Sequence, residues 1–152
     1  MNHQKIFYYS FLLLLLTGCD EKKEQGMNSN DLKLNQIQVI GSHNSYRIHP
    51  VQDMFNLMTG LNPELAAELD YGHPSFDVQF SQHGIRQIEI DVYHDPEGGL
   101  FYNQRGNLFI GLPVPSGIEE LLDPGLKVLH FPDIDYRTHY LTFIDALTAV
   151  KT

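Results

Sequence analysis

The stretch Ile85-Arg-Gln-Ile-Glu-Ile-Asp-Val92 decides the fold of this chain, because apolar and polar residues alternate along it with the period of a β-strand. We predict a strand over residues 86–92, with its apolar side chains on one face and Glu89 and Asp91 on the other. Two carboxylates on one face are costly to bury unless a cation or a basic side chain compensates them. The same stretch therefore predicts a piece of sheet and a candidate site.

Polar groups also stand at the ends of two further predicted strands. Residues 36–41 have strand character, and His43 and Asn44 follow them directly. Lys127-Val-Leu-His-Phe131 forms another predicted strand, which carries His130 near its end. We expect the three strand ends to converge, so that their polar side chains share one site.

Helical segments are predicted between and after these strands. Asn62 can cap a helix and Pro63 suits its first position, whereas residues 45–62 are expected to form a long connection. Gly84 is expected to end the second helical stretch. The predicted segments are residues 62–69, 74–84 and 142–150. Strands that alternate with helices favour the α/β class.

The composition is that of a globular domain with an acidic surface. The chain has 152 residues and a formal net charge of −9, and its basic residues do not cluster. Because nucleic-acid binding depends on phosphate neutralisation by Lys and Arg, we exclude nucleic acid as a partner. An acidic protein that acts on an anionic lipid would need a cation between the two.

The N-terminus has the pattern of a targeting segment. Lys5 precedes an apolar run over residues 6–16, which is too short to span a bilayer comfortably. The run ends in Leu16-Thr-Gly-Cys19, which resembles a bacterial lipobox and would make Cys19 a lipidated N-terminus. A simple secretory signal with an incidental cysteine is the alternative. Cys19 is the only cysteine, so no disulfide is expected.

These features predict a lipid-anchored protein of the bacterial cell envelope, on its periplasmic side or its surface. Acyl chains on Cys19 would hold the chain on a membrane by burying methylene groups. The predicted parts are a signal peptide over residues 1–18, a polar tether over residues 19–35 and a catalytic domain over residues 36–152.

The acidic pair and Asn44 have the chemistry of a hard-cation site. Carboxylate and amide oxygens without cysteine ligands suit Ca²⁺ or Mg²⁺. Asn44 would supply a neutral oxygen beside Glu89 and Asp91. The alternative is that the two carboxylates form ion pairs with the arginines at positions 86, 105 and 137.

His43 and His130 are candidates for proton transfer, since imidazole titrates near neutrality. The other histidines are interpreted as solvated or capping residues, although His73 and His94 could also support the site. An acid and a base beside a cation would be able to open a phosphodiester.

Several ordered motifs together resemble the phosphatidylinositol-specific phospholipase C family, most closely its bacterial calcium-dependent branch. The resemblance runs from about residue 36 to Thr152. It rests on Gly41-Ser-His-Asn-Ser-Tyr46, Leu69-Asp-Tyr-Gly-His-Pro74, Gly84-Ile-Arg-Gln-Ile-Glu-Ile-Asp-Val92, Asp95-Pro-Glu-Gly-Gly99 and Gly125-Leu-Lys-Val-Leu-His-Phe-Pro-Asp-Ile-Asp-Tyr-Arg137.

The resemblance implies a (β/α)8 TIM-barrel-like phosphodiesterase fold with its site at the C-terminal ends of the strands. A complete barrel typically needs about 250 residues, so we expect residues 36–152 to form its first part. The resemblance also implies that His43 and His130 are catalytic. Asn44, Glu89 and Asp91 would bind Ca²⁺, and a monomer would act on a phosphoinositide-type phospholipid. The family's further acidic ligand is expected to follow the last residue.

Other functions stay open from the sequence. Glycerophosphodiester phosphodiesterases share the Glu-x-Asp strand that Glu89 and Asp91 match, but they have His-Arg-Gly where this chain has His43-Asn-Ser45. Sphingomyelinase D-like enzymes are a more distant possibility. A catalytically inactive, ligand-binding lipoprotein fragment is the alternative that involves no enzyme.

Overall fold

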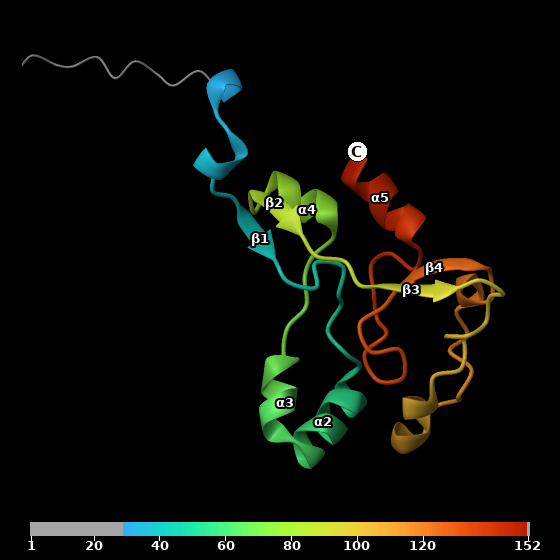
Figure 1. Cartoon of the computed structure of the whole chain (residues 1–152). Helices are drawn as coiled ribbons and strands as arrows, with labels where there is room; N and C mark the ends of the chain where they lie inside the picture. The colour runs from blue at the N-terminus through green and yellow to red at the C-terminus, as the bar shows by residue number, and fades with distance from the viewer. Residues whose placement is uncertain (1–28, 152) are drawn as a thin grey trace, which may run out of the picture. The chain divides into compact units, whose positions relative to one another are not determined.

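The computed structural model describes residues 29–151, so the predicted signal peptide and Cys19 lie outside the described residues (Figure 1). The chain divides into two compact units, of which the second begins at Gln38. The described part of the first unit contains two 3-10 turns, η1 (Ser29–Asp31) and η2 (Leu34–Gln36). Between residues 29 and 151, no helix combines the length and apolarity needed to cross a membrane.

The first strand is shorter than predicted and begins later. β1 covers Ile40–Ser42, while Gln36, the first residue predicted as strand, is the last residue of the 3-10 turn η2. Ile37 and Val39 are 45% and 48% exposed, so they lack the neighbouring layer that would extend the strand. β1 pairs in parallel with β2 (Ile85–Ile88).

The predicted strand over residues 86–92 is in fact two strands in different sheets. β2 ends at Ile88, and β3 (Val92–Asp95) begins after a break that contains Glu89 and Asp91. β3 pairs antiparallel with β4 (Gly125–Val128), with Val92 opposite Val128. The prediction of one continuous strand was wrong because β2 pairs with β1 while the following residues pair with β4.

The described strands form two separate two-stranded sheets, β1–β2 and β3–β4. This arrangement confirms a mixed α/β architecture, and residues 29–151 contain no closed barrel. The predicted third strand over residues 127–131 is replaced by β4, which ends two residues before His130. His130, predicted inside the strand near its end, instead lies just after the end of β4.

The helices confirm part of the sequence prediction. The predicted cap is present, since Asn62 Oδ1 accepts a hydrogen bond from the Leu65 amide at 3.1 Å. The structure adds a helix in the region expected to be a connection. The segments are α2 (Gln52–Leu61), α3 (Pro63–Glu68), α4 (Phe76–Ser81), η3 (Arg105–Ile110), η4 (Glu119–Leu121) and α5 (Phe143–Lys151).

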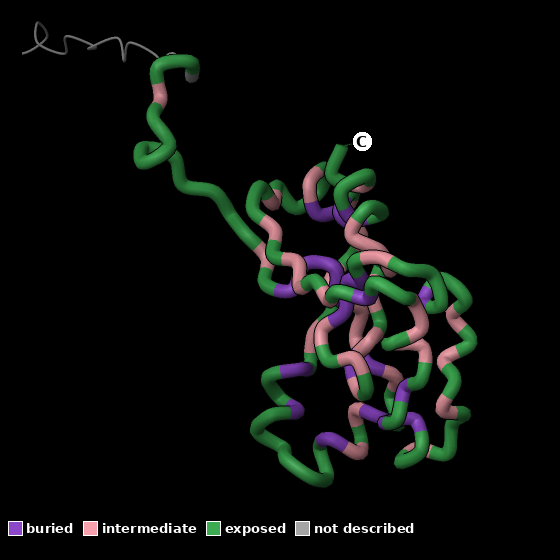
Figure 2. The backbone as a smooth tube through the Cα atoms, turned by 45° about the vertical axis from the view of Figure 1, so that its right-hand side comes forward, coloured by how far each residue is buried: buried purple, intermediate pink, exposed green. Residues whose placement is uncertain are grey.

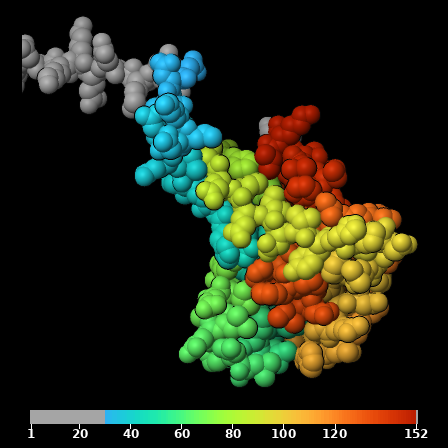
Figure 3. Space-filling model, in the orientation of Figure 1, coloured from blue at the N-terminus to red at the C-terminus, as the bar shows by residue number. Residues whose placement is uncertain are grey.

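Two apolar clusters hold the second unit together, and buried positions gather where its segments meet (Figure 2). The first joins Tyr46, Phe76, Val128 and Ala146, which come from the loop after β1, from α4, β4 and α5. The second cluster contains Met54 and Met58 of α2, Ala66 of α3 and Leu69, which directly follows α3. In Figure 3 the green α2–α3 pair lies beside the orange segment around η3, in agreement with the contacts between α2 and η3.

Candidate active site

The loop after β1 is tied directly to the break after β2. The Ser45 amide donates to the Glu89 carbonyl at 3.0 Å, and the Glu89 amide donates to Ser45 Oγ at 2.9 Å. Asn44 adopts a left-handed conformation with φ of 49°, which asparagine tolerates better than most residues. The tight turn after β1 thus brings the first predicted site segment against the second.

His43 lies at the rim of an open cavity of about 600 Å³ that Tyr71 and His73 also line. The His43 Nε2 atom lies 3.7 Å from Glu89 Oε2, and both side chains are accessible to solvent. On the other side of the ring, Nδ1 lies 3.3 Å from the Tyr71 hydroxyl. The His43 carbonyl also meets His73 Nε2 at 2.8 Å, so the histidine interpreted as a possible support does contact the site.

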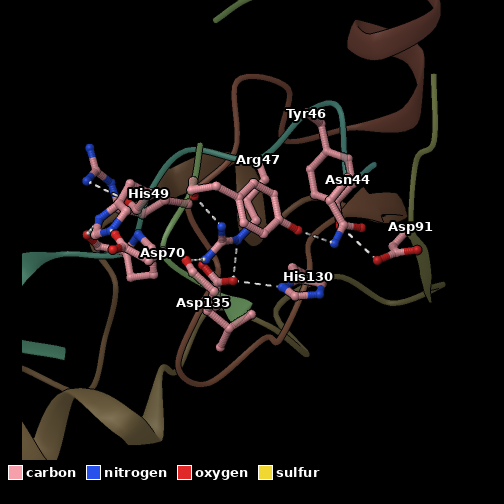
Figure 4. Close-up of polar contacts among 12 residues, drawn as sticks. Asn44, Tyr46, Arg47, His49, Asp70, Asp91, His130 and Asp135 are labelled. Carbon is pink, nitrogen blue, oxygen red and sulfur yellow. Dashed lines mark hydrogen bonds and ion pairs between the residues drawn. The ribbon is translucent and has the colours of Figure 1, made fainter. Parts of the chain in front are cut away.

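Asn44 and Asp91 are each held by a tyrosine (Figure 4). The buried Asn44 side chain donates through Nδ2 to the Tyr71 hydroxyl at 2.9 Å. Its Oδ1 atom makes no hydrogen bond within residues 29–151. The Tyr46 hydroxyl donates to Asp91 Oδ2 at 2.9 Å. Burial raises the pKa of Tyr46, and its hydrogen bond to Asp91 raises that pKa further, so Tyr46 stays protonated and donates a hydrogen bond.

His130 lies in a more enclosed environment than His43. Its Nδ1 atom lies 2.7 Å from Asp135 Oδ2, and its side chain is 13% exposed. The Tyr93 hydroxyl donates to the His130 carbonyl at 2.7 Å. A carboxylate at Nδ1 fixes the orientation of the ring and leaves Nε2 to face other groups.

A fully buried arginine supports both histidine segments. Arg47 donates through Nε to Asp135 Oδ2 at 2.5 Å and through Nη2 to the Leu69 carbonyl at 2.8 Å. Its Nη1 atom donates to the Tyr71 carbonyl, and the guanidinium carbon lies 4.4 Å from the centre of the Tyr71 ring. The Arg47 guanidinium therefore holds both Asp135, the partner of His130, and Tyr71, the partner of His43 (Figure 4).

The structure brings the predicted site residues onto neighbouring segments through these networks. His43 and Glu89 meet directly, whereas Asn44, Asp91 and His130 are each fixed by a neighbouring side chain. Across the described part of the chain, no group of three or more His, Cys, Asp or Glu side chains is placed to hold a metal ion. The ligand set predicted from the sequence contains two carboxylates, Glu89 and Asp91, and one amide, Asn44, so it is not itself a group of this kind.

The alternative that the acidic pair is neutralised by arginines receives no support. Between residues 29 and 151, neither Glu89 nor Asp91 pairs with an arginine or lysine. Arg86 instead donates to the carbonyls of Phe80 and Ile85, and Arg137 donates to a backbone carbonyl. The two carboxylates and the free Asn44 oxygen thus fit a hard, oxygen-seeking cation in their chemistry.

Sequence reasoning missed the residues that hold the site in place, namely Tyr46, Arg47, Tyr71 and Asp135. Three of them lie inside motifs that were noticed for other residues, and Arg47 directly follows one. The signal that could have found them is the presence of a polar or aromatic side chain within a few residues of each candidate. Their partners could not be found in that way, because Arg47 and Asp135 are 88 positions apart.

His43 lines the cavity and lies beside Glu89, while Asn44, Asp91 and His130 are held on neighbouring segments by other side chains. A family model described as phosphoinositide phospholipase C, Ca²⁺-dependent, matches residues 32–152. The chain therefore belongs to the Ca²⁺-dependent phosphoinositide phospholipase C family, which confirms the resemblance seen in the sequence. A comparison with curated proteins found no match, and a comparison with solved structures found none either.

Proposed function

We propose that this protein is a calcium-dependent phosphoric diester hydrolase that cleaves a phosphoinositide-type phospholipid through a cyclic inositol phosphate. The observation that carries the proposal is the meeting of His43 Nε2 and Glu89 Oε2 at 3.7 Å beside an open cavity. An imidazole that lines the cavity and has a carboxylate beside it suits proton transfer next to a cation-bound phosphate. Family membership supports the general kind of chemistry.

Asn44 Oδ1, Glu89 and Asp91 would hold the Ca²⁺. Support comes from their oxygen chemistry and from the lack, within residues 29–151, of any arginine or lysine paired with either carboxylate. The cation, when bound, would lower the pKa of the inositol 2-hydroxyl and offset negative charge at phosphorus. Because the Tyr46 hydroxyl donates to Asp91 Oδ2, Oδ1 is the oxygen that would bind the cation.

The two histidines would divide the proton transfers and charge stabilisation. The substrate's 2-hydroxyl would lose its proton to a carboxylate of the site, Glu89, and attack phosphorus as the bond to the diacylglycerol oxygen breaks, while the Nε2 side of His43 stabilises the phosphorane-like transition state. His130 donates a proton to the diacylglycerol oxygen that leaves, while Asp135 holds its ring through Nδ1. Water then opens the cyclic phosphate. A head group with a free neighbouring hydroxyl is therefore required.

The proposal extends to the fold and the location of the protein. Residues 36–152 would form the first part of a (β/α)8 barrel, and β1 paired in parallel with β2 is the arrangement that begins such a barrel. Cys19 would carry the lipid anchor of a monomeric cell-envelope protein. Both statements rest on the sequence motifs and on the family.

The test is turnover of phosphatidylinositol vesicles by the full chain with Ca²⁺ and with the chelator EGTA. The expected result is a transient cyclic inositol phosphate with Ca²⁺ and none with EGTA. Glu89→Gln should abolish the response to Ca²⁺, while Glu97→Gln, an exposed acid in the turn after β3, should retain it. Undiminished turnover in EGTA would refute the proposal. Release of glycerol 3-phosphate without a cyclic product would favour the glycerophosphodiester phosphodiesterase alternative.

A further inference from the structure

Tyr71 connects two site residues through a single hydroxyl group. The oxygen accepts a hydrogen bond from Asn44 Nδ2 at 2.9 Å and lies 3.3 Å from His43 Nδ1. A phenol has one proton to donate. Because the Asn44 amide already donates to the oxygen, the hydroxyl proton is available to the unprotonated Nδ1 of His43.

The direction of this hydrogen-bond chain determines which atoms of His43 and Asn44 are left to bind other groups. With the amide donating, Asn44 Oδ1 is left free and the neutral His43 ring carries its proton on Nε2, toward Glu89. In the opposite direction, Nδ1 of His43 would donate to the hydroxyl, and the hydroxyl would donate to Asn44 Oδ1. Asn44 would then turn its NH₂ group, which cannot bind a cation, to the side away from Tyr71.

The nearby carboxylate favours the first direction. Glu89 Oε2 lies 3.7 Å from His43 Nε2, so a proton on Nε2 faces an acceptor, whereas a bare Nε2 would set two lone-pair groups against each other. The two ends of the hydrogen-bond chain are therefore linked. The state in which Asn44 offers its oxygen is also the state in which His43 offers an N–H at Nε2.

Tyr71 is held firmly enough to serve this purpose. Its carbonyl accepts from Arg47 Nη1, and its ring lies under the Arg47 guanidinium. Arg47 is itself fully buried and bonded to Asp135 and the Leu69 carbonyl. The position of the phenol is thus set by buried groups, while its hydroxyl points to the solvent-accessible edge of the site.

We propose that Tyr71 is a positioning residue whose hydroxyl couples the tautomer of His43 to the orientation of the Asn44 amide. The cation-facing oxygen and the Nε2 proton are thereby present in the same state of the site. The roles of His43 and Asn44 in this inference rest on the proposed function, but the hydrogen-bond chain does not.

The experiment compares the full chain with Tyr71→Phe, which keeps the ring under Arg47 and removes only the hydroxyl. Nitrogen NMR spectra of the imidazoles at mildly alkaline pH show which ring nitrogen carries the proton. We expect a single tautomer of His43 in the unaltered chain, with the proton on Nε2 and a hydrogen-bonded Nδ1. In Tyr71→Phe the hydrogen bond at Nδ1 should be lost and a share of the rings should carry the proton on Nδ1, although Glu89 still favours Nε2. Calorimetry with Ca²⁺ alone should show binding weakened about tenfold, as is typical when a residue that orients a ligand is removed.

Tyr140→Phe is the matched control, because its hydroxyl also accepts a hydrogen bond, from the Phe76 amide at 2.8 Å, but outside this network. It should leave the tautomer of His43 and the Ca²⁺ affinity unchanged. The same single tautomer in Tyr71→Phe as in the unaltered chain would overturn the positioning role. If Tyr71→Phe changes the tautomer of His43 but the unaltered chain binds no Ca²⁺, the positioning role of Tyr71 is supported and the proposed cation site is refuted.

Discussion

Arg47 and Asp135 form a fully buried ion pair in which Arg47 Nε donates to Asp135 Oδ2 at 2.5 Å. The same carboxylate oxygen lies 2.7 Å from His130 Nδ1, and the same guanidinium holds Tyr71. Asp135 Oδ1 makes no hydrogen bond within residues 29–151. The stability of the loop after β4 and the orientation of His130 therefore depend on one pair of charges.

Asp135→Asn should lower the free energy of unfolding by about 3 kcal/mol or more, because it leaves the Arg47 charge buried without its partner. Urea denaturation measures this loss. Asp70→Asn is the control, since Asp70 pairs with His49 at the surface and its side chain is 62% exposed. An exposed pair of this kind contributes at most about 1 kcal/mol. Equal, small losses in the two variants would contradict the importance given to the buried pair.

His130→Ala should reduce turnover of phosphatidylinositol about 10²- to 10⁴-fold, the usual contribution of a positioned proton donor. Its Ca²⁺ affinity, measured by calorimetry, should be unchanged, because His130 is assigned to the leaving oxygen. His94→Ala, at an exposed position on β3, should retain activity. Loss of Ca²⁺ binding in His130→Ala would show that the imidazole is a ligand instead.

Tyr46→Phe should make stability less dependent on pH in alkaline solution. Burial and the hydrogen bond to Asp91 raise the pKa of Tyr46 in the folded state above the ordinary value of 10.0. The contribution of Tyr46 is thus complete below pH 10.0 and is lost as the pH rises toward the folded-state pKa. Urea titrations at increasing alkaline pH should show a smaller decline in Tyr46→Phe. An identical decline in both proteins would count against this coupling.

Two glycine substitutions should have opposite effects on stability. Gly60 lies in α2 with open space around an added Cβ, so Gly60→Ala should raise the free energy of unfolding by about 0.5–1 kcal/mol. Gly106→Ala should lower it, because the new Cβ would lie 2.2 Å from the Asp133 carbonyl oxygen. Asp133 belongs to the loop after His130, so turnover should fall as well. Urea denaturation and the vesicle assay test both effects, and a stabilising Gly106→Ala would refute the close packing of this loop.

The sequence determined the local features whose causes are close along the chain. Asn62 caps α3 as predicted, because the cap depends on a side chain and an amide three residues apart. The helix predicted over residues 142–150 is present as α5, although its buried residue is Ala146 and the apolar Ile144, Leu147 and Val150 are exposed. α2 was missed although Met54 and Met58 have helical spacing, because no polar side chain caps its start at Val51. The motifs also indicated the family, which a match over residues 32–152 confirms.

The tertiary structure alone decided which segments meet. The alternation in residues 85–92 is compatible with one strand, but pairing with β1 and then with β4 divides it, and Glu89 and Asp91 lie in the break. Arg47 finds Asp135 across 88 positions, and Tyr71 reaches His43 across 28. The sequence around a residue does not indicate such distant partners. They are determined by the packing of the whole domain and by the cost of burying a charge unpaired.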